Sequence, residues 1–344
     1  MNKIRNNWKL EEVLALYKKP FNEILAQAHQ IHIDNHKKDM VQVCTLLSVK
    51  TGGCPEDCGY CSQSIHSDEP IEATPLMSLD EVRERATIAR DQGSTRFCMG
   101  AAWRRPSNKN IDRVIKMIDV VHELGMESCV TLGMLSQDQA IRLSKSGLNY
   151  YNHNLDTSRE HYSKVISTRN YQDRLNTLKY VRESGIKVCS GGILGLGESR
   201  EDRAKLLIEL ANLEQHPESV PINMLVHMEG TRLYKKEKVD ELEFVKTIAI
   251  SRILMPKTYV RLSAGRESMA DSMQALCFYA GANSVFYGEE LLTAPNVTVE
   301  KDRELFYKLG MKIEGEEDQI EELNKRKNPD IEKKQNIYNL KLIN

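Results

Sequence analysis

The stretch Cys-Pro-Glu-Asp-Cys-Gly-Tyr-Cys, residues 54–61, carries three cysteines at Cys-x-x-x-Cys-x-x-Cys spacing and is the most informative part of the chain. A cubane 4Fe-4S cluster is normally held by four cysteine thiolates, so three clustered thiolates leave one iron open to a small-molecule ligand. The stretch therefore predicts an iron-sulfur centre with an open iron, and Cys54, Cys58 and Cys61 are its candidate ligands.

Two other interpretations of these cysteines stay open. Structural zinc sites usually take four protein ligands, often from two Cys-x-x-Cys pairs, and no second pair follows downstream. Cysteines without a ligand are common as small buried side chains, but the neighbouring glycines and Pro55 indicate a loop rather than a core. The spacing favours the iron-sulfur cluster over both alternatives.

Around this stretch, short apolar runs alternate with longer amphipathic ones, which predicts eight strands separated by helices. The strands are expected at 41–49, 95–100, 127–133, 149–156, 187–194, 220–227, 258–264 and 283–288. Eight such units over about 250 residues predict an α/β fold of the (β/α)8 TIM-barrel type. The rival is a doubly wound open sheet with a Gly-x-Gly-x-x-Gly loop, a spacing that Gly192, Gly195 and Gly197 do not match.

Helix signals support this alternation. Ser78 with Glu81 and Ser136 with Gln139 fit capping boxes, in which a serine oxygen and a side chain three residues later bond to free backbone amides. Glycines expected to end helices precede four of the predicted strands, at positions 93, 125, 147 and 185. Helix starts and stops therefore agree with the strand positions.

The chain divides into three segments. Residues 1–40 predict helices interrupted near Pro20, which we expect to cover one end of the barrel. Residues 41–310 form the barrel itself. Residues 311–344 are rich in Lys, Glu and Asn and have few apolar side chains, so they predict a disordered charged tail.

The composition excludes several classes of function. A chain of 344 residues with 40% hydrophobic residues can bury a large core, and its formal net charge of -1 argues against nucleic acid as a partner. No apolar stretch reaches the 18 or so residues of a membrane span, and no export signal is evident. We therefore expect a cytoplasmic protein whose eight cysteines are reduced and available as ligands.

Three further cysteines, Cys98, Cys129 and Cys189, fall on the second, third and fifth predicted strands. Their separations of 31 and 60 residues correspond to one and two strand-helix units, so the thiols lie at similar heights and can converge inside the barrel. The alternative is packing, because cysteine is a good small core residue. The matching heights favour a second metal site, whereas Cys44 and Cys277 are assigned to packing.

Polar residues mark the expected active-site end of the fourth strand. Asn152, Asn154 and Asp156 alternate, so their side chains share one face and offer a wall to a small molecule such as a ribose. The alternative is a polar strand end that meets solvent. The fifth strand then ends in glycines, at positions 191, 192, 195 and 197. Without side chains, the backbone there permits either the close approach of a nucleoside or a tight turn.

Three histidines, His29, His32 and His36, stand at helical spacing in the N-terminal segment. This spacing could chelate a metal, but histidines on an N-terminal helix seldom do, and we assign them a structural role.

Several longer strings resemble the biotin synthase family within the radical S-adenosylmethionine superfamily. They are Arg-Phe-Cys-Met-Gly-Ala-Ala-Trp (96–103), Tyr-Tyr-Asn-His-Asn-Leu-Asp-Thr-Ser (150–158), Val-Cys-Ser-Gly-Gly-Ile (188–193) and Tyr-Val-Arg-Leu-Ser-Ala-Gly-Arg (259–266). The resemblance runs from about residue 40 to 310. It matches loosely over 62–70 and hardly at all in the C-terminal tail.

The resemblance implies a homodimeric barrel enzyme that inserts sulfur into dethiobiotin to form biotin. A 5′-deoxyadenosyl radical would come from S-adenosylmethionine on a 4Fe-4S cluster held by Cys54, Cys58 and Cys61, with electrons from a flavodoxin-like or ferredoxin-like protein. A 2Fe-2S cluster would donate the sulfur, and its implied ligands are Cys98, Cys129, Cys189 and Arg261. Cofactor contacts are implied at Tyr60, Asn154, Asp156, Gly192 and Ile193. Substrate contacts are implied at Lys50, Asn152 and Asn223.

Arg261 is a ligand that the residue type alone does not suggest. A protonated guanidinium has no lone pair for a metal, and on its own the residue predicts a buried ion pair. Two rivals to the implied activity remain: a radical S-adenosylmethionine mutase or maturase without the second cysteine set, and a zinc-binding scaffold without enzymatic activity.

Overall fold

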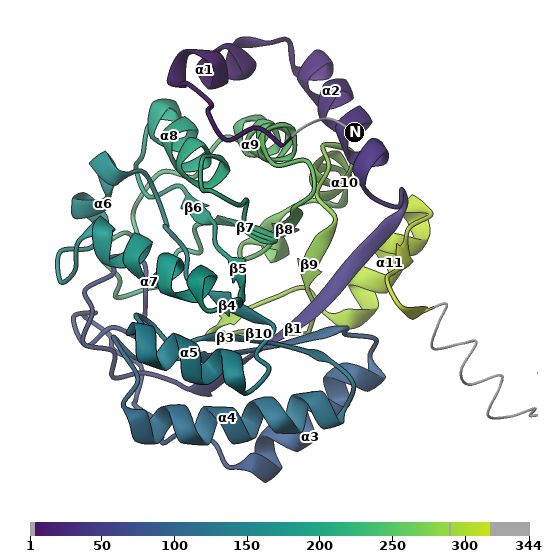
Figure 1. Ribbon diagram of the computed structural model, residues 1–344. Helices are drawn as coiled ribbons and strands as arrows, with labels where there is room; N and C mark the ends of the chain where they lie inside the picture. The colour runs from purple at the N-terminus through teal and green to yellow at the C-terminus, as the bar shows by residue number, and fades with distance from the viewer. Residues whose placement is uncertain (1–3, 289, 317–344) are drawn as a thin grey trace, which may run out of the picture.

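The computed structural model describes residues 4–288 and 290–316, and its centre is a closed parallel barrel with eight strand positions, enclosed by helices (Figure 1). The predicted barrel is confirmed. Its strands are β1 Met40–Lys50, β2 Arg96–Ala101, β3 Glu127–Thr131, β4 Tyr150–Asn152, β5 Lys187–Cys189, β6 Gly192–Leu194, β7 Ser219–Met224, β8 Tyr259–Leu262 and β9 Ser284–Phe286. Pairing of β1 with β9 closes the barrel.

The fifth predicted strand, 187–194, needs correction because the structure divides it in two. β5 pairs with β4 and β7, whereas β6 pairs with β7 and makes a single bridge, from Gly192 to Asp156, with the chain after β4. A Cβ atom at Gly191 would lie 1.9 Å from the carbonyl oxygen of Pro221, so the two backbones approach more closely than any other residue permits. The ladder is interrupted at this contact, and the fourth strand is also shorter than predicted, ending at Asn152.

The helices pack around the outside of the barrel (Figure 1). They are α1 Leu10–Lys18, α2 Phe21–Asn35, α3 Leu79–Asp91, α4 Asn108–Glu123, α5 Gln137–Lys145, α6 Arg159–Val165, α7 Tyr171–Glu183, α8 Arg200–Ala211, α9 Glu241–Leu254, α10 Asp271–Tyr279 and α11 Val299–Leu309. Both predicted capping boxes form, with the Ser78 and Ser136 hydroxyl oxygens accepting from backbone amides three residues on. These caps fix where α3 and α5 begin.

Alternation along the strands separates two environments. Side chains that point outward, such as Val43, Val130 and Val220, are fully buried under the surrounding helices. Side chains that point inward include Cys98 and Arg261, which are equally buried but polar or polarisable. The apolar core is therefore the layer between strands and helices, and the barrel interior is left for chemistry.

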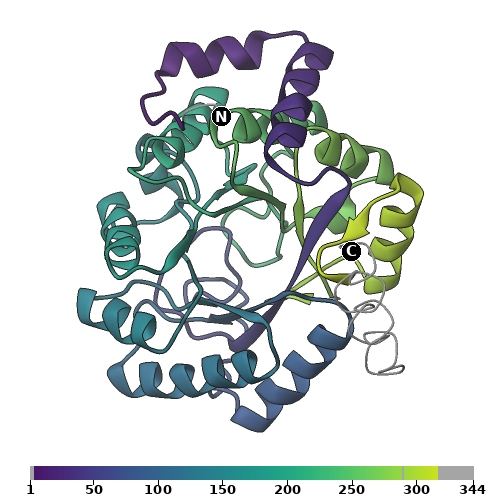
Figure 2. The ribbon, with the colours of Figure 1, turned by 45° about the vertical axis from the view of Figure 1, so that its right-hand side comes forward.

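The N-terminal helices lie on the flank of the barrel and not across its end, so that expectation is corrected. Both views place α1 and α2 outside the layer of α8, α9 and α10 (Figures 1 and 2). The Tyr17 hydroxyl lies 3.1 Å from Thr247 Oγ1 on α9, and Trp8 N donates to Asn212 Oδ1 just after α8. The helices take this position because α9 has apolar side chains on nearly every side, and α1 and α2 bury those on its outer face.

The end of the described chain also differs from expectation. A short strand, β12 Lys312–Ile313, pairs in parallel with β1, and Ile313 is buried. Residues 311–316 therefore belong to the fold, and the predicted tail begins too early. The rest of the predicted tail, 317–344, lies outside the described residues.

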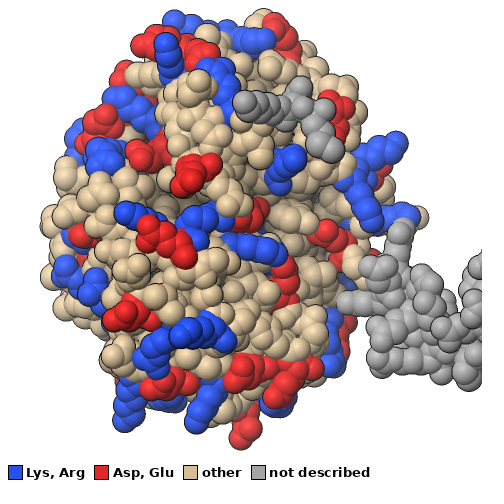
Figure 3. Space-filling model, in the orientation of Figure 1, with Lys and Arg blue, Asp and Glu red and all other residues tan. Residues whose placement is uncertain are grey.

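Charges of both signs are interspersed on the face shown in Figure 3, with no large area of one sign among its described residues. This mixture agrees with the formal net charge of -1. None of the helices in the described ranges combines the length and the apolar character that a membrane span requires.

Candidate active site

Both predicted cysteine sets line one cavity of about 320 Å³ at the carboxyl end of the barrel strands. Active sites of such barrels are built at this end, from the ends of several strands and the loops that follow them. The predicted site residues that line the cavity are Cys54, Cys58, Tyr60, Cys61, Cys98, Cys129, Asn152, Asn154, Asp156, Cys189, Ile193, Asn223 and Arg261. Residues far apart in the sequence therefore face one enclosed space.

The first cysteine set lies on the loop that follows β1. Gly52 has a φ of 68°, and a Cβ atom there would lie 2.5 Å from the Ile71 carbonyl oxygen, so the turn requires glycine. Cys54 N donates to the Gln63 carbonyl at 3.0 Å, and Cys61 N donates to the Cys58 carbonyl at 3.0 Å. These bonds fold the loop back on itself and hold the three cysteines together.

Burial keeps the first set of thiols protonated. It raises the pKa of Cys58 to about 11 and that of Cys61 to about 12. Arg169 opposes this effect at Cys58, and its Nη2 atom lies 3.7 Å from the Cys58 sulfur. A bound metal would supply the positive charge that the thiolate form needs.

No three His, Cys, Asp or Glu side chains in the described residues are arranged to hold one metal ion. A single structural zinc takes all of its ligands on one ion, usually four of them. In an iron-sulfur cluster the cysteines bind separate irons and do not have to converge on one point. Three clustered thiols are a donor set that suits a cluster with one open iron.

The second cysteine set comes together inside the barrel. Cys98 on β2 lies directly opposite Cys129 on β3, and Cys189 on β5 lies opposite Asn152 on β4. All three thiols are buried, and Cys129 is hydrogen-bonded to the other two. The structure thus places the three sulfurs as neighbours on one inward-facing layer.

Hydrogen bonding shifts the pKa values of these thiols in opposite directions. The bond from Cys129 and the charge of Arg261 lower the pKa of Cys189 to about 5, against the effect of burial. Bonds to the other two cysteines raise the pKa of Cys129 well above its usual range. Both effects favour the thiolate form of Cys189, which is the form that binds metal.

Arg261 does not form the ion pair that its residue type predicts. Its Nε atom donates to Ser284 Oγ at 2.9 Å, and its Nη2 atom lies 3.1 Å from the Cys44 sulfur. The side chain is fully buried, and Nη1 has no hydrogen-bond partner. No carboxylate among the described residues pairs with it, and a buried nitrogen without a partner of this kind calls for an explanation.

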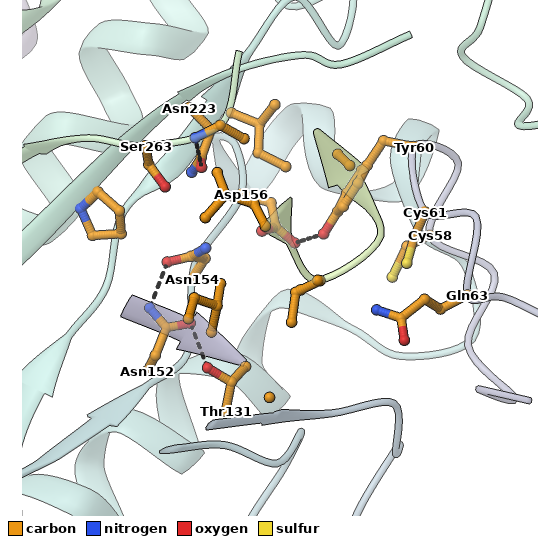
Figure 4. A pocket seen from close by; sticks show the side chains of 18 of the residues that line it. Cys58, Tyr60, Cys61, Gln63, Thr131, Asn152, Asn154, Asp156, Asn223 and Ser263 are labelled. Atoms are coloured by element: carbon orange, nitrogen blue, oxygen red, sulfur yellow. Dashed lines mark hydrogen bonds between the residues drawn. The ribbon is translucent and has the colours of Figure 1, made fainter. Parts of the chain in front are cut away.

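Asn152 and Asn154 form a connected wall, seen in Figure 4. Asn152 Oδ1 accepts from Thr131 Oγ1 at 3.1 Å, and Asn152 Nδ2 lies 3.3 Å from the Cys189 sulfur. Asn154 Oδ1 accepts from Gly191 N at 3.1 Å. The interpretation of these residues as a solvent-facing strand end therefore does not hold, because they line the cavity.

Asp156 is a buried carboxylate with two strong partners. Tyr60 donates its hydroxyl to Asp156 Oδ2 at 2.9 Å, and Arg174 Nη2 forms an ion pair with the same oxygen. Arg174 also donates to the Asn154 carbonyl at 2.7 Å. Sequence reasoning missed Arg174, because it stands on a helix after the strand and belongs to no motif there.

Two predicted residues lie outside the cavity lining. Lys50 donates from its ammonium group to the Gly52 carbonyl and, at 3.3 Å, to the Ala102 carbonyl. Gly192 contributes a carbonyl that accepts from Asn223 Nδ2 at 2.9 Å, so it holds a lining residue in place. Lys50 is thus bound to backbone where the loop begins.

A hairpin that sequence reasoning missed completes the cavity. It consists of β10 Glu290–Leu291 and β11 Ala294–Pro295, and its residues 291–294 line the space. Thr293 Oγ1 lies 3.2 Å from Ser62 Oγ on the cysteine loop. Its sequence, Leu-Leu-Thr-Ala, carries no recognisable motif that could have predicted this position.

Two family models match this chain. Residues 48–210 match the Radical SAM superfamily, and residues 221–312 match the Biotin and Thiamin Synthesis associated domain. Among solved structures, the FeFe-hydrogenase maturase from Carboxydothermus hydrogenoformans aligns with a TM-score of 0.78 and 18% identity over 89% of this chain and 76% of that chain. A methylornithine synthase aligns with a TM-score of 0.76 and 18% identity over 89% and 94%. These two likenesses concern the fold alone.

The sequence relatives are much closer. Biotin synthase of Thioalkalivibrio sulfidiphilus is 60% identical over 90% of this chain and 92% of its own length. Biotin synthase of Acinetobacter baumannii is 58% identical over 90% and 94%. With this identity over nearly the whole length of both relatives, the chain belongs to the biotin synthase family.

Proposed function

We propose that this protein inserts sulfur into dethiobiotin to form biotin, using S-adenosylmethionine and two iron-sulfur clusters of different type. The observation that carries the proposal is one cavity lined by two separate cysteine sets. A mutase or maturase on the same barrel would need only the first set. The second set gives the site a sulfur source beside the substrate position.

Cys54, Cys58 and Cys61 would hold a 4Fe-4S cluster, and Cys98, Cys129, Cys189 and Arg261 would hold a 2Fe-2S cluster. The unpartnered, fully buried Nη1 atom of Arg261 supports its place in the second set. When bound, these groups and S-adenosylmethionine supply the radical that removes hydrogen from an unactivated carbon and the sulfur that replaces it.

The polar wall would bind and orient the nucleoside part of S-adenosylmethionine. Tyr60 and Arg174 both engage Asp156 Oδ2, which leaves Oδ1 to accept from a ribose hydroxyl. Arg174 also compensates the buried carboxylate charge, so the wall is organised before the ligand arrives. Asn154, whose Oδ1 is already occupied, would donate from Nδ2.

Asn152 and Asn223, both of which line the cavity, would face the ureido ring of dethiobiotin. Both are held by hydrogen bonds, Asn152 to Thr131 and Asn223 to the Gly192 carbonyl. Ile193 would pack against the cofactor, where it lines the cavity. Lys50 would reach the substrate only after leaving its two carbonyl partners.

The chain also limits side reactions. Cys98 and Cys129 of the second set are buried among Tyr150, Phe286 and Leu291, which would keep water and other hydrogen donors away from the substrate carbon. The hairpin carrying Thr293 closes the cavity on the side of the cysteine loop. We also infer a cytoplasmic homodimer that takes electrons from a flavodoxin-like or ferredoxin-like protein.

The test is an anaerobic assay with dethiobiotin, S-adenosylmethionine and a chemical reductant, after reconstitution with iron and sulfide. We expect both 5′-deoxyadenosine and biotin as products. Formation of 5′-deoxyadenosine with an isomerised or cleaved dethiobiotin and no biotin would point to a mutase or maturase. Bound zinc without acid-labile sulfide would contradict enzymatic radical chemistry altogether.

A further inference from the structure

Cys44 is a buried thiol to which the proposed function gives no role. It lies on β1, its side chain points into the barrel, and it is fully buried. It packs in the same small cluster as Cys98 and Cys129, apart from the main apolar core. Assignment to ordinary packing, as the sequence predicts, overlooks this neighbourhood.

The nearest charged partner of Cys44 is the arginine of the second set. Arg261 Nη2 lies 3.1 Å from the Cys44 sulfur, whereas the weaker contact of that sulfur with Gln42 Oε1 is 3.5 Å long. Arg261 extends from β8 across β9 to reach β1, and its other terminal nitrogen, Nη1, has no hydrogen-bond partner among the described residues. The guanidinium thus contacts the Cys44 sulfur through Nη2, while Nη1 is buried without a hydrogen-bond partner among the described residues.

We propose that Cys44 is an alternative fourth ligand of the second iron-sulfur cluster and that Arg261 masks it. The inference rests on the proposed function. Four thiols and one arginine offer five donors for the four protein positions of a 2Fe-2S cluster. Thiolate is the ligand that such clusters normally use, whereas a protonated guanidinium has no lone pair to give.

The exchange changes ligands and leaves the electron count unchanged. Arg261 would give up its place on the cluster and take up a proton, and Cys44 would lose its thiol proton on taking that place. One proton is thus released and one is taken up. The cluster then has four cysteine ligands, as in ordinary 2Fe-2S proteins.

The test compares Arg261→Leu with two double variants. The first is Arg261→Leu/Cys44→Ala, which removes both candidate donors. The second, Arg261→Leu/Cys277→Ala, is the matched control, because Cys277 is an equally buried thiol on α10 outside the barrel. Each protein is reconstituted with ⁵⁷Fe and sulfide, and Mössbauer spectra separate 2Fe-2S from 4Fe-4S iron. Thermal unfolding of the apo-proteins checks that all of them fold.

We expect Arg261→Leu and its Cys277 control to retain the 2Fe-2S signal, with a spectrum shifted toward an all-thiolate cluster. The Cys44 double variant should lose that signal while keeping its 4Fe-4S iron. Equal 2Fe-2S content in the two double variants, whether retained or lost, would overturn the inference. Absence of the 2Fe-2S signal from the wild-type protein would instead overturn the proposed function, so the two failures are distinguishable.

If either double variant is too unstable to reconstitute, Cys44→Ser in the Arg261→Leu background replaces Cys44→Ala. Serine keeps the volume of cysteine and offers a hydroxyl in place of the thiol. A weaker 2Fe-2S signal than in Arg261→Leu alone supports the inference. An unchanged signal and spectrum overturn it.

Discussion

At the scale of single residues, the site depends on how buried charges are compensated. Asp156 has its countercharge in Arg174, and the two side chains are only 2% and 5% exposed. Arg261 has no carboxylate partner among the described residues, and its side chain contacts Ser284 Oγ and the Cys44 sulfur. The charge of Asp156 is thus compensated by a side chain of the opposite sign, whereas that of Arg261 is not compensated by a carboxylate.

We predict that Arg174→Met destabilises the protein strongly. Removing one member of a buried ion pair leaves the other charge unpaired, which typically costs about 3–5 kcal/mol. The change would be measured as the free energy of unfolding in urea. It should also weaken binding of S-adenosylmethionine, because the Asn154 carbonyl and Asp156 both lose their anchor.

The surface pair Arg142–Asp112 provides the control for that prediction. Its side chains are 35% and 62% exposed, so Arg142→Met should cost no more than about 1 kcal/mol. Similar losses in the two variants would contradict the structural importance that we assign to the Arg174 pair.

At the scale of elements, the two-part fifth strand depends on one close contact. Gly191→Ala would place a methyl group 1.9 Å from the Pro221 carbonyl oxygen, and the backbone of β7 cannot move without breaking its pairs. We predict a severe loss of stability, measured by thermal unfolding.

Gly125→Ala is the matched variant for this position. Gly125 has a φ of 79° but no atom within 4 Å of the added methyl group, so only backbone strain of about 1–2 kcal/mol is expected. If Gly191→Ala proved as mild as Gly125→Ala, the close strand contact would not be what divides the fifth strand.

The docking of α2 should depend on pH through two histidines. Burial, together with the charge of Arg252, lowers the pKa of His32 to about 3 and that of His36 to about 4. Their rings stack 5.4 Å apart, and Arg252 Nη1 lies 2.8 Å from His36 Nε2. The structural role predicted for these histidines agrees with this neutral, packed arrangement.

We predict that stability falls as the pH drops from about 6.5 to 4. In this range the two histidines become protonated in the unfolded chain but stay neutral in the folded protein. The free energy of unfolding therefore decreases by about 1.4 kcal/mol per pH unit for each histidine. His32→Phe keeps the stack but cannot be protonated, and it should reduce the slope. An unchanged slope in urea titrations would contradict the assignment.

The sequence predicts the positions of strands and helices along the chain better than it predicts which elements pack against one another. Apolar periodicity places all eight strand positions, because every strand is buried on its outward face. It cannot place α1 and α2 on the barrel flank, since that position depends on the outer face of α9. The division of the fifth strand depends likewise on a contact with Pro221, which is distant in sequence.

At the scale of the whole molecule, the barrel brings two chemically different cysteine sets into one cavity. Spacing predicts each set, because strand-helix units have a regular length and the Cys-x-x-x-Cys-x-x-Cys run is local. Spacing does not predict Arg174, Cys44 or the hairpin at Thr293, which reach the site through tertiary contacts. These residues carry no signal that distinguishes them from ordinary core or surface positions.

In the proposed function the two cysteine sets have separate roles, one in forming the radical and one in donating sulfur. The most direct test measures 5′-deoxyadenosine and biotin from Cys58→Ala and Cys129→Ala under the same anaerobic conditions. We predict that Cys58→Ala forms neither product, whereas Cys129→Ala still forms some 5′-deoxyadenosine but no biotin. Biotin formation by Cys129→Ala at the wild-type rate would show that the second cysteine set is not needed to donate the sulfur.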